Sequence, residues 1–70
     1  MTPIREALLT VLAALSEAAP ELRLGQLVAN LATAAQGAKV EAIWDAEDEE
    51  LLRAAQRLLE HYHSRNTTVV

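Results

Sequence analysis

The residues that could do chemistry gather in an acidic run at positions 45–50, directly after Trp44. Carboxylates can coordinate a divalent cation or bind a basic partner. A calcium loop alternates its oxygen ligands around a central glycine, and this run has neither feature. Acidic residues also open helices, where they cap free backbone N–H groups and complement the helix dipole. We therefore predict that Asp45 and Asp48 cap a helix and that the remaining carboxylates face solvent or a basic partner.

The other side chains capable of chemistry are dispersed along the chain. His61 and His63 are two residues apart on a predicted helix, so they point to different sides, unlike the i, i+4 pair that binds zinc. The chain has no cysteine, which excludes disulfides, thiolate nucleophiles and sulfur-ligated metals. No serine or threonine lies in a recognisable nucleophile motif. We therefore predict a protein that is not an enzyme and that holds no metal or cofactor.

Polar residues bordering an apolar stripe form a second candidate site. Gln26 and Asn30 lie one helical turn apart, and amides in that position usually satisfy loop backbone, here the connection at residues 38–44. Trp44 is expected to anchor the core, because a large aromatic is the richest source of buried area in a chain without Phe. A binding surface around Trp44 is the alternative. The binding residues that we predict are Arg23, Gln26, Asn30, Trp44, Asp45 and Asp48.

Length and composition indicate one small domain with thin stability. The chain has 70 residues, of which 51% are apolar, and a domain of this size buries only about 60% of the surface that its unfolded chain exposes. A homodimer is therefore expected to add buried area. The net charge of −4 and the scattering of its six basic residues argue against nucleic-acid binding. No apolar run reaches the roughly 18 residues that cross a bilayer.

The absence of cysteine from so small a domain favours a reducing, cytoplasmic location. The alternative is a secreted protein, because residues 5–18 loosely resemble a secretory signal peptide. Against it, Glu6 lies where a signal is basic, and cleavage after Ala18 would leave too little chain for a core.

Apolar side chains at helical spacing predict an all-α domain of three helices, over residues 3–18, 22–36 and 46–64. Thr2 and Pro3 are typical of a helix start, and Pro20 ends the first helix. Gly37 is suited to close the second. Short connections favour near-antiparallel neighbours. We expect a single domain over residues 1–64 and a flexible tail over residues 65–70.

Two positions call for particular explanations. Residues 38–44 lack helical periodicity, and we predict an ordered connection before the last helix, with Val40, Ile43 and Trp44 plugging the open end of a helical pair. A short strand is the alternative there. Gly25 costs the second helix about 1 kcal/mol relative to Ala, which suggests a close approach of another backbone or a distortion.

Two blocks of the chain resemble a family of short uncharacterised bacterial proteins. The first, at residues 22–31, contains the pattern R-x-G-Q-L-x-x-N, and the second, at residues 43–51, joins an aromatic residue to E-D-E-E-L. The resemblance covers residues 22 to about 59. It implies that the second helix and the acidic helix start pack together as one unit, and it implies no activity, cofactor or substrate.

The sequence therefore predicts a small protein–protein interaction or adaptor module that associates with itself. The alternative is a small acidic regulator that binds a basic partner, such as an antitoxin, an immunity protein or a nucleic-acid mimic.

Overall fold

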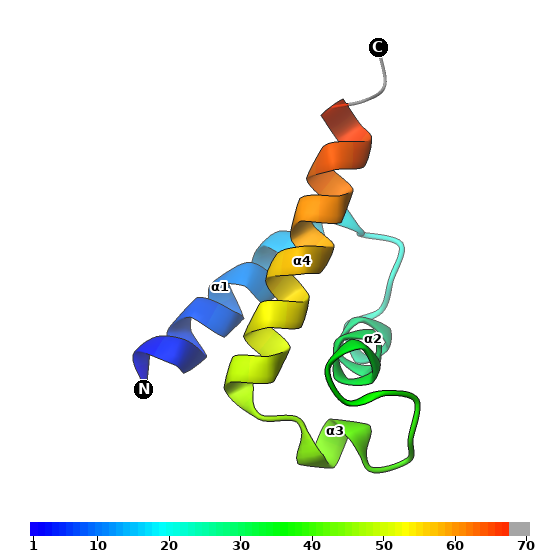
Figure 1. Cartoon of the computed structure of the whole chain (residues 1–70). Coiled ribbons are helices and arrows are strands. Elements are labelled where there is room, and N and C mark those ends of the chain that lie inside the picture. Colours follow the sequence, from blue (N-terminus) through cyan, green and yellow to red (C-terminus); the bar gives the residue numbers. More distant parts are fainter. Residues whose placement is uncertain (68–70) are drawn as a thin grey trace.

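A computed structural model describes residues 1–67, with side chains through residue 64. Its helices are α1 (Pro3–Ala18), α2 (Leu24–Gln36), the short α3 (Ala42–Asp45) and α4 (Asp48–Thr67) (Figure 1). Residues 1–67 contain no strand. The predicted all-α domain with three main helices is confirmed. The last helix continues to Thr67, past the predicted end at residue 64, and residues 68–70 of the predicted tail lie outside the described part.

Helix α1 has the predicted boundaries because both of its ends carry the expected signals. The Thr2 hydroxyl oxygen accepts a hydrogen bond from the Arg5 backbone N–H at 3.1 Å, and Pro3 occupies the first turn, where its missing N–H has no helical partner. At the other end Ala19 closes the helix, donating its N–H to the Leu15 carbonyl at 2.9 Å. Pro20 follows, and its ring disfavours a helical conformation for the residue before it.

Helix α2 begins two residues later than predicted, because the chain first makes a turn. The Leu22 N–H donates to the Ala19 carbonyl at 3.1 Å, so Leu22 belongs to that turn, and Arg23 is the extended residue before the helix. Gly37 ends α2 as predicted, with a φ of 88° that side-chain-bearing residues rarely adopt. Its N–H donates to the Thr33 carbonyl at 2.7 Å.

Helices α1 and α4 form the main contact of the fold. They lie side by side with their N-terminal ends at the same end of the molecule, whereas α2 is seen almost along its axis in the same view (Figure 1). The predicted near-antiparallel packing of neighbours is therefore wrong. After the turn at residues 19–22 the chain changes direction, so that α2 lies across α1 instead of running back along it (Figure 1).

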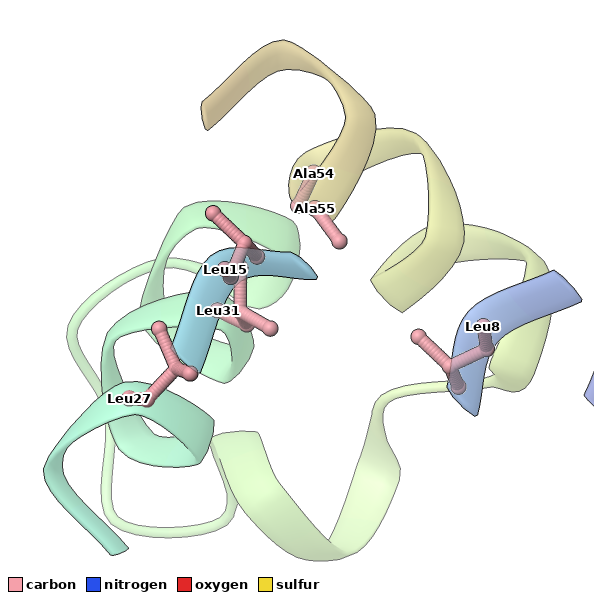
Figure 2. Packing of buried hydrophobic residues seen from close by; sticks show 6 residues of the cluster. All are labelled: Leu8, Leu15, Leu27, Leu31, Ala54 and Ala55. Carbon is pink, nitrogen blue, oxygen red and sulfur yellow. The ribbon is translucent and has the colours of Figure 1, made fainter. Parts of the chain in front are cut away.

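The core is built from leucines of α1 and α2 and alanines of α4. Leu15 is fully buried and lies in one cluster with Leu27 and Leu31 of α2 and with Ala54 and Ala55 of α4 (Figure 2). Small alanine side chains let the α4 backbone approach its neighbours closely, and the leucines fill the space between the helices. Partly buried apolar residues surround this cluster: Val11, Leu12, Leu22, Ala35, Leu51, Leu52, Leu58, Leu59 and Tyr62.

The apolar side chains that recur at helical spacing are mostly buried or half-buried, with exceptions at the helix starts. Ile4 is 37% exposed and Leu24 is 59% exposed, although both fit the helical spacing of their stripes. Each lies in the first turn of its helix, at the margin of the packed region. Two alanines, Ala32 of α2 and Ala54 of α4, are buried as well.

Gly25 offers a small test of stability. A Cβ built at this position meets no atom within 4 Å, so the predicted close approach of another backbone is wrong. Because alanine is the better helix former, Gly25→Ala is expected to stabilise the domain by up to about 1 kcal/mol. Thermal unfolding should then show a rise in Tm of a few degrees.

The chain's other glycine is the control, because Gly37→Ala would place a side chain at a strained φ of 88° and should lower Tm. A fall in Tm for Gly25→Ala would contradict this account.

Candidate functional site

The connection before α4 is ordered, as predicted, but it is helical. After Gly37 the backbone makes a turn in which the Ala42 N–H donates to the Lys39 carbonyl at 3.2 Å. The Asp45 N–H then donates to the Glu41 carbonyl at 2.8 Å, which forms the single turn of α3. The alternative of a short strand is therefore wrong.

Helix α3 turns its smallest apolar side chain inward and its largest outward. Ala42 is 4% exposed, whereas Trp44 is 89% exposed. Successive residues of a helix are rotated by about 100°, so position 44 lies on the opposite side from position 42. The prediction that Trp44 anchors the core is wrong, because α3 packs against α2 with Ala42 on its buried side and Trp44 on its exposed side.

The other large apolar residues of this connection are exposed as well. Val40 is 98% exposed and Ile43 is 57% exposed, so the predicted plug at the end of a helical pair is wrong. A single exposed apolar side chain is ordinary, whereas three within five residues make a candidate contact surface. We call residues 40–44, with the exposed side chains Val40, Ile43 and Trp44, the α3 apolar segment.

One carboxylate oxygen of Glu50 closes the loop that carries this segment. It accepts a hydrogen bond from the Gln36 side-chain amide at 2.7 Å and another from the Glu47 backbone N–H at 3.0 Å. Gln36 is the last residue of α2, and Glu50 lies in the first turn of α4. The two bonds therefore tie together both ends of the connection at residues 37–47 and hold the α3 apolar segment in place.

The cap of α4 differs from the predicted one by two residues. The Glu47 backbone N–H donates to the Glu50 side chain, which is one half of the capping contact predicted for Asp45 and Asp48; the Glu47 side chain makes no hydrogen bond with the described residues. An N-cap residue needs an extended backbone, and Asp45 instead belongs to the helical turn of α3. Asp48, Glu49 and Glu50 fill the first turn of α4, where negative charge is favourable to the dipole, as predicted.

Asp48 forms an ion pair with Arg5, which lies near the N-terminus of the chain. Its carboxylate accepts a hydrogen bond from Arg5 Nε at 2.7 Å, and this bond, with the attraction between the charges, raises the pKa of Arg5 above its ordinary value. The two side chains retain 53% and 33% of their exposure, so solvent screens the pair and it adds little stability. The ion pair joins the starts of α1 and α4, and the predicted binding role of Asp48 stays a prediction.

The contacts of Glu50 predict a dependence of stability on pH. The hydrogen bond from the Glu47 N–H, followed by that from Gln36, lowers the Glu50 pKa below its ordinary value of 4.5. A carboxylate whose pKa is lower in the folded state stabilises that state above the unfolded pKa and loses this effect as pH falls through the folded pKa. We therefore expect Tm to fall with pH below about 4.5, and Glu50→Gln to make that fall shallower.

Glu60→Gln is the matched control, because Glu60 lies exposed on the same helix and has no hydrogen bond or ion pair within the described residues. Melting curves of the three proteins at neutral and acid pH make the comparison. Equal pH dependence of wild type and Glu50→Gln would show that the contacts of Glu50 do not contribute.

The remaining predicted site residues lie around α2. Arg23, Gln26 and Asn30 are exposed, and the Gln26 side-chain oxygen accepts a hydrogen bond from the Arg23 backbone N–H at 2.8 Å. Gln26 thus satisfies loop backbone, as predicted, but at the start of its own helix and not at residues 38–44. The exposure of Trp44 leaves it almost no area for contact with Gln26 or Asn30, so the predicted polar rim beside it is not formed.

Carboxylates without partners flank the α3 apolar segment. Four acidic side chains near it are exposed and make no hydrogen bond or ion pair with the described residues: Glu41, Asp45, Glu47 and Glu49. Lys39 is the nearest basic residue along the chain. The described residues form no pocket and gather no group of three potential metal ligands. None of the helices described is both long and apolar enough to cross a bilayer.

The two sequence blocks that suggested a family meet in space. The first covers the entry and most of α2, the second covers α3 and the start of α4, and α2 packs against both helices. Membership of that family stays a prediction. No family model, curated protein or solved structure matches the chain.

Proposed function

We propose that this chain is a small, non-enzymatic protein–protein interaction module of the cytoplasm, and that it docks through the α3 apolar segment. The observation that carries the proposal is the 89% exposure of Trp44 on an ordered helical turn. Tryptophan is the side chain most enriched among residues that dominate binding energy, because it buries a large area with few rotatable bonds. Because Trp44 is almost fully exposed in the free chain, nearly all of its apolar area is available for burial by a partner.

The way the segment is held supports the same proposal. Its loop is tied at both ends by Glu50, and its inner side is fixed by the buried Ala42. A surface that is already ordered loses little conformational entropy when a partner binds. Self-association, which the sequence predicts, stays a prediction, and a second copy is one of the outcomes of the crosslinking test below.

Photo-crosslinking in cells that make the chain tests the proposal. Benzoylphenylalanine in place of Trp44 retains an aromatic ring and should give a covalent adduct of defined mass, either with a second copy or with another protein. The matched control is the same residue at Leu24, which is 59% exposed on a different element. Absence of an adduct from positions 40, 43 and 44 would contradict the proposal, as would equal adducts from positions 44 and 24.

A small acidic regulator that binds a basic partner is the second candidate. The four unpartnered carboxylates near α3 favour it. A regulator of this kind binds through charge alone, so Trp44→Ala would leave its affinity intact while reversal of Glu47 and Glu49 would abolish it. Glu50 is unsuited to that test, because it holds the loop together.

A further inference from the structure

We propose that the occupant of the α3 apolar segment is a different protein, one that presents an apolar groove bordered by lysine or arginine. This inference rests on the proposed function and adds the chemistry of the partner. Its basis is the way charge and apolar area alternate along the segment, where Glu41 lies between Val40 and Ile43, and Asp45 follows Trp44.

The charged side chains around the α3 apolar segment are mostly negative. Glu41, Asp45 and Glu47 are exposed and lack partners within the described residues, and Lys39 is the one basic residue between positions 36 and 50. A partner that covers Trp44 and Ile43 must also face these carboxylates. Interfaces pair a negative patch with a positive one, since like charges brought together at an interface are costly.

The same charges disfavour a second copy as the occupant. Symmetric dimers use the same surface on both subunits, so residues near the two-fold axis face their own copies. A dimer through the α3 apolar segment would bring two sets of three carboxylates together against only two lysines. A basic rim on another protein removes this repulsion and adds attraction.

The protein carries its own reporter for this contact. Trp44 is the only tryptophan, and its exposure predicts the emission of a solvated indole. Docking into an apolar groove should shift that emission to shorter wavelength. No label is needed at the site.

Titration of the full chain with three peptides makes the test. The first is an amphipathic helical peptide with a leucine stripe bordered by lysine, and the other two replace every lysine by glutamine or by glutamate. We expect the lysine peptide to shift Trp44 emission at low salt, added salt to weaken its binding, and the glutamine peptide to bind about tenfold less tightly, the loss expected for about three exposed ion pairs. The glutamate peptide should not bind.

Two triple variants locate the charges responsible. Glu41→Gln, Asp45→Asn and Glu47→Gln combined should weaken the lysine peptide about tenfold. Glu17→Gln, Glu21→Gln and Glu60→Gln combined remove the same charge from exposed sites elsewhere and should leave the affinity nearly unchanged. Circular dichroism of both variants verifies that the helices are retained. The salt and peptide comparisons on the wild-type chain do not depend on either variant.

The outcomes separate this inference from the function on which it rests. Equal binding of the lysine and glutamine peptides, or equal effects of the two triple variants, overturns the basic rim and leaves docking intact. A blue shift of Trp44 with rising chain concentration, together with a doubled mass in light scattering, identifies a second copy as the occupant and overturns the inference. No shift with any peptide, combined with no crosslinked adduct from position 44, overturns both.

Discussion

Leu15→Ala is expected to remove about half of the stability of this domain. Stability of about 0.05 to 0.15 kcal/mol per residue amounts to roughly 4 to 10 kcal/mol for a chain of this length. Replacing a fully buried leucine by alanine costs about 3 to 5 kcal/mol when the neighbours cannot close the cavity. Leu15 is fully buried at the junction of α1, α2 and α4 (Figure 2), so its loss weakens contacts among all three helices at once.

Urea unfolding followed by circular dichroism measures this loss, and thermal unfolding should show Tm lowered by ten degrees or more, at about 4 to 8 °C per kcal/mol. Leu9→Ala is the control on the same helix. Leu9 is 45% exposed and lies outside the core cluster, so its replacement should cost much less. Equal losses for the two variants would mean that Leu15 does not hold α2 and α4 against α1.

The sequence predicts those features of the fold that depend on interactions between residues close together in the chain, such as the ends of the helices. Thr2, Pro3 and Pro20 fix the ends of α1 through hydrogen bonding and ring sterics, and Gly37 fixes the end of α2 through its positive φ. The stripes of leucine and alanine then place the core on the correct sides of the helices. Each of these signals involves only a few neighbouring residues, so it can be recognised without knowledge of the tertiary contacts.

The packing direction and the cap of α4 depend on contacts between distant residues. Arg5 and Asp48 are far apart in the chain, and so are Gln36 and Glu50. Within the acidic run both Asp45 and Glu47 could begin a helix, and the choice depends on whether residues 41–45 first form a turn of their own. That turn is stabilised by Ala42 against α2, a contact that the periodicity of the segment does not reveal.

The error at Trp44 has a simple physical origin. The sequence predicts a large aromatic in the core of a chain without phenylalanine, because burying its area contributes strongly to stability. The core is instead formed by leucine and alanine, and the buried residue of α3 is Ala42. The residue best able to stabilise a core is therefore left on the surface, and this is what makes residues 40–44 a candidate site.

Trp44→Ala is expected to separate binding from stability. Because its side chain is 89% exposed, the substitution should change the free energy of unfolding by no more than about 0.5 kcal/mol, as at other surface positions. Binding should suffer far more. Loss of a tryptophan that dominates an interface costs about 2 kcal/mol or more, which is roughly a thirtyfold loss of affinity. Fluorescence anisotropy of a dye-labelled lysine–leucine peptide measures it without the missing indole.

Leu24→Ala is the matched control, since Leu24 is also largely exposed but lies at the start of α2. It should leave both the unfolding free energy and the peptide affinity nearly unchanged. A loss of several kcal/mol in the stability of Trp44→Ala would instead return this residue to the core that the sequence predicted for it. Unchanged affinity in a stable Trp44→Ala would assign binding to the carboxylates alone and favour the acidic regulator over the docking module.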